Sequence, residues 1–298
     1  MEKLIVVDWW NLSWRRQINI WVQGARPRTL VAAIAPVVVA TVLAGSNWRP
    51  LPALLALIVA LALQIGVNYA NDYSDGIRGT DENRVGPTRL TAAGLAPANS
   101  VKRAAFISFA VAAIAGLVVA SLSSWWVLIV GALALIAAWG YTGGQNPYGY
   151  RGLGEFSVFL FFGVVATVGT FYVQTLQITF AAWAASIPMG ALSCALLVIN
   201  NIRDRKRDSE VGKRTLAVRL GDKKSRHLFS ALLVLAYLAA PLTGNPLALL
   251  TLATAPQALS LAREVNAGAS GTSLIPLLAR TGQLQLHFAI TFALALSF

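Results

Sequence analysis

The sequence contains few of the residues on which disulfide-bonded proteins, zinc sites and nucleophilic hydrolases depend. Among 298 residues there is one cysteine, Cys194, and there are two isolated histidines, His227 and His287. A single cysteine excludes an internal disulfide and a multi-cysteine zinc cluster, and isolated histidines do not make a histidine-based metal site. No Ser/His/Asp or Cys/His arrangement for covalent catalysis is present. Cys194 lies inside an apolar run, where a small core residue is expected.

Charge is also scarce. Only 12% of the residues are charged, 56% are hydrophobic, and the mean hydropathy is +0.63. This composition excludes an ordinary soluble domain and predicts an integral membrane protein. The net charge of +12 would suggest a nucleic-acid partner in a soluble chain. In a membrane chain it indicates cytoplasmic loops beside anionic lipid, so we expect a lipid bilayer and no nucleic acid as partner.

Long apolar runs recur along the whole chain and predict an all-α fold. Runs of about 17 residues or more with almost no charge are typical of transmembrane helices. Nine such spans are predicted, at 29–45, 51–75, 101–121, 125–142, 155–174, 178–201, 226–243, 246–262 and 282–298. They divide into two four-helix halves plus one helix, around a central cavity.

The segment 1–28 differs from the spans that follow it. Tryptophans alternate with arginines there, a pattern that favours a helix lying in the headgroup region, so residues 1–28 are predicted to form an interfacial segment and 29–298 the polytopic domain. We expect no cleavable signal peptide, because no adequate apolar h-region is present. With no transit segment evident either, a prokaryotic cytoplasmic membrane is the expected location.

The distribution of basic residues predicts the orientation. If the N-terminus is cytoplasmic and the nine spans alternate, 23 Lys and Arg residues lie inside and only Arg49 lies outside. Positive residues concentrate on the cytoplasmic side of membrane proteins. The N-terminus is therefore expected inside and the C-terminus outside.

Two polar stripes close the second and sixth predicted spans, both on the cytoplasmic side. On a helix, Asn68, Asp72 and Asp75 lie at i, i+4 and i+7. Asn201, Asp204 and Asp208 follow at i, i+3 and i+7 in the sixth span. The segment from Asn71 to Asp75 overlays that from Asn200 to Asp204 at an offset of 129 residues. The two stripes are expected to face one another.

The chemistry of these stripes favours magnesium and phosphate. Carboxylate and amide oxygens are hard ligands suited to Mg²⁺, which binds through one or two carboxylates together with phosphate oxygens. A diphosphate could be held between two such faces. Basic residues that could neutralise its oxygens lie near by: Arg78, Arg84, Arg89, Arg151, Arg203, Lys213 and Arg214.

Two other interpretations remain open. In the first, the acids pair with neighbouring Lys and Arg on a solvated loop, which is less expected for two clusters in register than for one. In the second, the chain is an ion-coupled transporter, although carboxylates that carry ions tend to lie nearer mid-span than these do.

Four segments together resemble the UbiA superfamily of intramembrane prenyltransferases, over nearly the whole chain from Trp21. They are Gly24–Thr29, Asn68–Asp81 with Arg89-Leu-Thr-Ala, Tyr148–Glu155 and Gly212–Gly221. These segments are most similar to the branch that prenylates 1,4-dihydroxy-2-naphthoate. The resemblance implies Mg²⁺-dependent transfer of a polyprenyl group from polyprenyl diphosphate to this acceptor. Diphosphate and CO₂ are lost and demethylmenaquinone is formed, in menaquinone biosynthesis. An acceptor such as 4-hydroxybenzoate is the alternative within the superfamily.

The resemblance also implies residue roles. Metal binding falls to Asp72, Asp75, Asp204 and Asp208, with Asn68, Asn71 and Asn201 assisting. Lys213, Arg214 and Arg151 stabilise the leaving diphosphate, and Arg26, Arg28 or Arg89 receives the acceptor carboxylate. Tyr141, Tyr148 and Tyr150 either line the acceptor site or belong to an interfacial aromatic belt. The first motif departs from the superfamily pattern, because Gly79 stands where an aspartate is common and Asp81 follows. Either Asp75 or Asp81 therefore completes the metal site.

Overall fold

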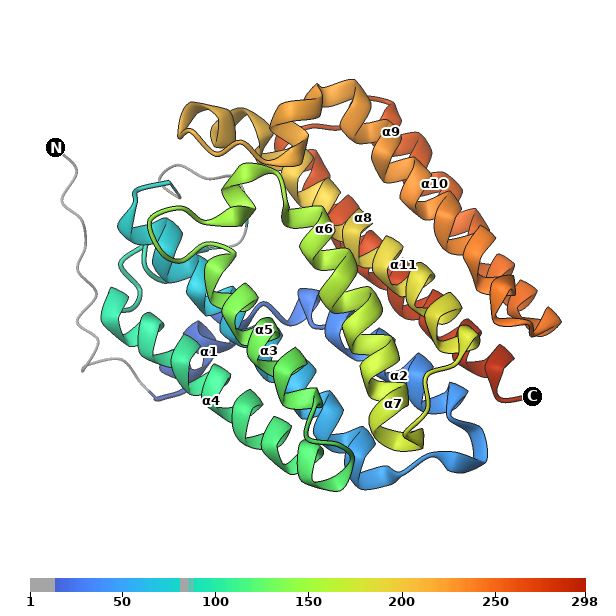
Figure 1. Cartoon of the computed structure of the whole chain (residues 1–298). Coiled ribbons are helices and arrows are strands. Elements are labelled where there is room, and N and C mark those ends of the chain that lie inside the picture. The colour runs from blue at the N-terminus through green and yellow to red at the C-terminus, as the bar shows by residue number, and fades with distance from the viewer. Residues whose placement is uncertain (1–13, 81–85, 87) are drawn as a thin grey trace, which may run out of the picture.

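The computed structural model describes residues 14–80, 86 and 88–298, and the regular structure of these residues is entirely helical. The helices lie side by side in one bundle, in which the C-terminal helices α8 to α11 occupy one side (Figure 1). The α-helices are α1 (Trp14–Ala25), α2 (Val31–Leu43), α3 (Pro50–Ile77), α4 (Ala98–Leu122), α5 (Val127–Gly140), α6 (Gly154–Val158), α7 (Ala166–Thr175), α8 (Phe180–Glu210), α9 (Leu216–Ala239), α10 (Ala255–Asn266) and α11 (Leu274–Leu296).

Several of these helices can cross a bilayer. Five helical segments of the described chain are long and apolar enough, and the bent pair Gln17–Thr29 and Val31–Leu43 would make a sixth. The five are Pro50–Ile77, Ala98–Leu122, Gly154–Thr175, Phe180–Glu210 and Leu216–Thr243. The chain is thus a multi-pass membrane protein.

The expected nine spans are matched in position but not all in length. Each predicted run coincides with helical structure. However, α5 is only 14 residues long, and the predicted eighth span begins as a 3-10 helix, Pro246–Thr254, before α10 continues it. A 3-10 helix rises more per residue than an α-helix, so a short segment of this kind reaches further across a bilayer. The count of nine remains a prediction.

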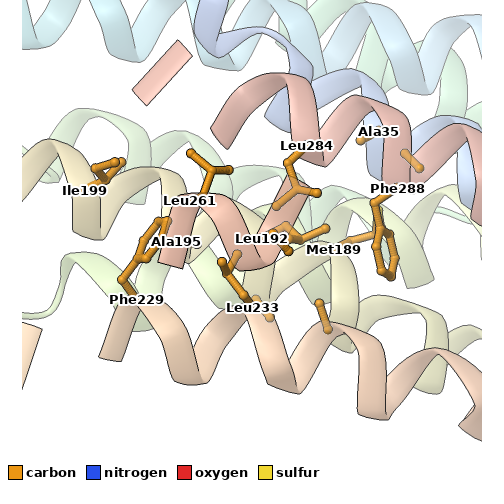
Figure 2. Close-up of a cluster of buried hydrophobic side chains, with 14 of the residues drawn as sticks. Ala35, Met189, Leu192, Ala195, Ile199, Phe229, Leu233, Leu261, Leu284 and Phe288 are labelled. Atoms are coloured by element: carbon orange, nitrogen blue, oxygen red, sulfur yellow. The ribbon is translucent and has the colours of Figure 1, made fainter. Parts of the chain in front are cut away.

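Helix α8 is the centre of the larger hydrophobic core. Its Met189, Leu192 and Ile199 are fully buried among side chains from α9, α10 and α11, including Phe229 and Phe288 (Figure 2). Alanines between these larger residues, such as Ala195, let neighbouring helices approach closely. This packing fixes the C-terminal half of α8, which carries the second polar stripe.

A second core cluster joins α1, α3, α4 and α5. In it Ile20 and Tyr69 are buried, and the Tyr69 hydroxyl donates a 2.7 Å hydrogen bond to the Trp21 carbonyl. Helix α1 is therefore packed on α3 as well as being amphipathic.

The expected division into two four-helix halves does not match these clusters, because Val168 and Phe171 of α7 pack with Ala40 of α2 in a third cluster, apart from the core around α8. Ala35 and Val39 place α2 in the cluster around α8 and α11, rather than with the first half (Figure 2).

A tight helix crossing lies beside the cavity described below. Residues Phe159–Val165 form a π-helical segment between α6 and α7, and Gly163 in it packs on Gly190 of α8. A Cβ atom at position 163 would lie 2.6 Å from the Gly190 Cα. Real Cβ atoms do not approach a backbone atom so closely, so only glycine fits this crossing.

We expect Gly163→Ala to lower the stability of the purified protein. Overpacking a helix crossing costs about 1–3 kcal/mol, which corresponds to several degrees in the melting temperature. Thermal unfolding in detergent measures this. Gly116→Ala is the control, because a Cβ there meets nothing within 4 Å. Equal melting temperatures for the two variants would show that the crossing tolerates a methyl group.

Candidate active site

A cavity of about 610 Å³ runs through the bundle, between α3, α4, α5, the α6–α7 segment and α8. Along α3 it extends from Ala56 to Asp75, 19 positions apart, which on a helix is about 28 Å. Small, aliphatic and aromatic residues line most of its length. The polar lining residues gather at the end where α3 and α8 terminate: Arg26, Asn68, Asn71, Asp75, Arg89, Tyr150, Asn200, Asn201, Asp204, Arg207, Asp208 and Lys213.

Asp75 contacts three side chains at this polar end. Its Oδ1 lies 2.9 Å from Lys213 Nζ and accepts a hydrogen bond from the Tyr150 hydroxyl, and its Oδ2 lies 3.9 Å from Arg89 Nη2. Asp75, Arg89 and Lys213 are all buried. A buried carboxylate needs such partners, since an isolated buried charge is strongly unfavourable. The cluster therefore brings two cations, Arg89 and Lys213, and one anion, Asp75, together at the polar end of the cavity.

Tyr150 lies between two cations. Lys213 Nζ is 4.6 Å from its ring centroid and the Arg78 guanidinium is 5.4 Å from it. Burial, and then the charge of Asp75, raise the pKa of Tyr150 well above its ordinary value. The phenol therefore remains a hydrogen-bond donor to Asp75 at any physiological pH, and its ring holds Lys213 by a cation–π contact.

The stripe on α3 differs from the expected one in a single member. The Asp72 carboxylate is fully buried outside the cavity lining and accepts 2.8 Å hydrogen bonds from the backbone N–H groups of Leu90 and Thr91. Asn71 faces the cavity in its place, and its Oδ1 accepts a hydrogen bond from the Thr142 hydroxyl at 2.6 Å. Asp72 thus fixes the loop after α3, while Asn68, Asn71 and Asp75 form the stripe on the cavity.

The stripe on α8 lies on the cavity as expected. Asp204 accepts two hydrogen bonds of 2.7 Å from Arg203, through Nε and Nη2. Asn201 donates from Nδ2 to Glu155 Oε1 at 3.0 Å. Asn201, Asp204 and Asp208 all line the cavity, opposite Asp75. The two stripes therefore meet across one space.

The basic residues divide into two groups. Arg26, Arg89 and Lys213 line the cavity. Three other basic residues that were predicted at the site are exposed and do not line the cavity: Arg28, Arg151 and Arg214. Arg78 donates to the carbonyls of Thr142, at 2.7 Å, and Gly144, so it anchors the loop after α5. Arg84 and Asp81 lie outside the described residues.

Tyr148 lies on the cavity rather than in a lipid-facing belt. Its hydroxyl is 2.9 Å from the Ala137 carbonyl, to which it donates, and 2.8 Å from Ser157 Oγ. It is therefore held at the boundary between the polar end and the apolar length of the cavity.

Three residues at the site were not predicted. Asn200 and Arg207 line the cavity, and the Glu155 carboxylate is buried behind Asn201. Asn200 and Arg207 share a helical face with Asp204, at i, i+4 and i+7, so the periodicity of α8 could have identified them. Glu155 carries no comparable signal, because its contact depends on how α6 packs on α8.

The donor set fits a magnesium–diphosphate group better than a metal held by protein alone. Within the described ranges no three His, Cys, Asp or Glu side chains are grouped as a metal site. Mg²⁺ needs only one or two carboxylates when phosphate oxygens and water complete its shell. Asp75, Asp204 and Asp208, with amides beside them and basic residues around them, provide this combination.

Comparison with known proteins agrees with this geometry. The sequence profile of the UbiA prenyltransferase family matches residues 33–273. The chain is 50% identical to 1,4-dihydroxy-2-naphthoate octaprenyltransferase of Mycobacterium tuberculosis, covering 93% of this chain and 97% of that protein. It is 40% identical to the Escherichia coli protein of the same name, covering 72% of each.

Solved structures share the fold at low sequence identity. The apo UbiA homolog from Aeropyrum pernix has a TM-score of 0.70 at 15% identity, covering 88% of this chain and 96% of that one. A UbiA homolog from Archaeoglobus fulgidus bound to GPP and Mg²⁺ has a TM-score of 0.64 at 12% identity, covering 94% and 100%.

Proposed function

The chain belongs to the UbiA prenyltransferase family, and from this premise we propose that it transfers a polyprenyl group from polyprenyl diphosphate to 1,4-dihydroxy-2-naphthoate at the polar end of its cavity. The enzyme acts in menaquinone biosynthesis. The observation that carries the assignment to this cavity is its division, over a total length of about 28 Å along α3, into a charged end and an apolar remainder. A charged diphosphate with a long hydrocarbon tail matches both parts.

In the proposed complex, Asp75, Asp204 and Asp208 hold Mg²⁺, with Asn71 and Asn201 assisting. When bound, Mg²⁺ neutralises charge on the diphosphate oxygens and so promotes their departure. Asp72 is left out of this set, because its carboxylate is already bound to two backbone amides. Lys213 and Arg207 line the same space and would bind the diphosphate oxygens as negative charge develops on them.

The reaction then proceeds without a covalent enzyme intermediate. The bond between C1 of the prenyl group and the diphosphate oxygen breaks, and the allylic cation is held in the buried cavity away from water, which would quench it. The naphthoate ring carbon that bears the carboxylate attacks C1. Loss of CO₂ returns an electron pair to the ring, which leaves the product at the quinol level of demethylmenaquinone.

The acceptor carboxylate would be bound by Arg26 or Arg89. Both line the cavity, whereas Arg28, the third candidate, is exposed. The side chain of Arg89 also lies beside Asp75, so it would bring the acceptor close to the leaving diphosphate.

We place the polar end of the cavity on the cytoplasmic side of a prokaryotic inner membrane. In this placement nine spans cross the bilayer, the N-terminus is inside, and α1 lies at the interface. The distribution of basic residues supports it, because the single outer Arg49 lies at the opposite end of α3 from Asp75.

The test is prenyl transfer by the purified protein in nanodiscs. It receives labelled polyprenyl diphosphate with 1,4-dihydroxy-2-naphthoate or 4-hydroxybenzoate, in Mg²⁺ or in EDTA. We expect product and released CO₂ from the naphthoate with Mg²⁺, none with EDTA, and full recovery when Mg²⁺ is restored. Product from 4-hydroxybenzoate alone would contradict the acceptor, and activity in EDTA would contradict the metal site. No product from either acceptor would contradict prenyl transfer.

A further inference from the structure

Two aromatic side chains line the end of the cavity opposite Asp75. Trp126, just before α5, and Tyr172, in α7, both line the cavity. We propose that these two residues, the distal pair, form the stop of the prenyl channel and limit the reactivity of donors whose tails are longer than the channel. This inference rests on the proposed function, since it assumes that the prenyl tail occupies the cavity.

The distal pair is a fixed structure. Trp126 Nε1 donates a 2.8 Å hydrogen bond to the Tyr172 hydroxyl, and the two ring centroids are 4.9 Å apart with an interplanar angle of 56°. The pair therefore links the N-terminal end of α5 to the C-terminal half of α7. Two rings held by both a tilted aromatic contact and a hydrogen bond make a more rigid boundary than two independent side chains.

The distal pair lies at the end of the cavity away from Asp75. Trp126 lines the cavity between the end of α4 and the start of α5, and its side chain is 43% exposed. Ala56 and Val173 line the same end, and both are too far from Asp75 to take part in chemistry.

An exposed tryptophan near a helix end also has a simpler explanation, as part of an interfacial aromatic belt. The neighbouring Trp125 fits that explanation, because it is 65% exposed and does not line the cavity. Trp126 differs from it in both its cavity position and its hydrogen bond. Because the two tryptophans are adjacent and only Trp126 lines the cavity, substitution of Trp125 is a matched control for substitution of Trp126.

The experiment measures kcat/KM for geranyl and octaprenyl diphosphate in the wild type, Trp126→Ala, Tyr172→Phe and Trp125→Ala. A geranyl tail, with two isoprene units, ends well short of the distal pair, whereas an octaprenyl tail reaches it. In Trp126→Ala we expect the ratio of octaprenyl to geranyl kcat/KM to rise about threefold to tenfold. Tyr172→Phe removes only the hydrogen bond, so the ratio should rise less. Trp125→Ala should keep the wild-type ratio.

Inhibition by inorganic diphosphate provides a second readout. Diphosphate has no tail, so it should inhibit all four proteins equally if the distal pair acts only on the tail. An unchanged or lower octaprenyl ratio in both Trp126→Ala and Tyr172→Phe would overturn the proposal, as would an equal rise in Trp125→Ala. Tyr172→Phe keeps the ring, so it tests the proposal even if Trp126→Ala does not fold. Failure of the proposed function would look different, because the wild type itself would transfer neither donor.

Discussion

Replacing Asp75 with asparagine should reduce kcat by about a hundredfold to a thousandfold while leaving the protein folded. Asp75 contacts Lys213, Arg89 and Tyr150 at the polar end of the cavity. The substitution keeps the size of the side chain but removes the charge. A Mg²⁺–diphosphate group would then lose an anionic ligand, and Lys213 would lose the partner that positions it.

The measurement is prenyl transfer at saturating donor, together with thermal unfolding to confirm folding. Glu210→Gln is the matched control. Glu210 lies at the end of α8 on the same side of the bundle, but its side chain is 67% exposed and pairs only loosely with Arg207, at 3.8 Å. We expect the control to retain wild-type activity. Full activity in Asp75→Asn would show that the Asp75 carboxylate is not needed as a metal ligand and would contradict its place in the proposed site.

Asp72→Ala should have a different and equally large effect, on stability. The carboxylate is 0% exposed and accepts hydrogen bonds from the N–H groups of Leu90 and Thr91. Hydrogen bonds to a charged group contribute about 1.5–3 kcal/mol each, and the substitution leaves two donors without their acceptor. A loss of about 3–5 kcal/mol should lower the melting temperature sharply or prevent recovery of folded protein.

Asp72→Asn distinguishes a structural from a ligand-binding carboxylate. The amide oxygen can accept from one of the two N–H groups, but its NH₂ faces the other donor, so an intermediate loss of stability is expected. Whatever fraction folds should retain most of its activity per molecule. An Asp72→Asn protein with wild-type melting temperature and no activity would instead show that the carboxylate acts on the metal directly.

Asn71 lines the cavity where Asp72 was expected, and this difference shows what helical periodicity in the sequence cannot predict. Relative to Asn68, an α-helix turns about 300° to Asn71 and about 400° to Asp72, so both lie within about 60° of the same face. Periodicity alone cannot choose between them. The choice is made by the loop carrying Leu90 and Thr91, whose N–H groups lie against Asp72 and hold its carboxylate away from the cavity.

The helices themselves were predictable because the apolar runs are long and almost free of charge. The second stripe was equally predictable, since Asn201, Asp204 and Asp208 lie on one regular helix and all face the cavity. The orientation of side chains in the loops was harder to predict from the sequence. Lys213 and Arg214 are adjacent, yet one is buried on Asp75 and the other is exposed. No helical period governs such a segment, so only the tertiary path of the chain decides which side chain turns inward.

The packing of α2 has a consequence for how the protein is made. Ala35 and Val39 are buried against α8 and α11, which follow α2 only after several other helices of the chain. During synthesis α2 is therefore made well before these partners. Until α8 and α11 are in place, the face of α2 that carries Ala35 and Val39 lacks the side chains that bury it in the folded protein, so its final packing is a late step of assembly.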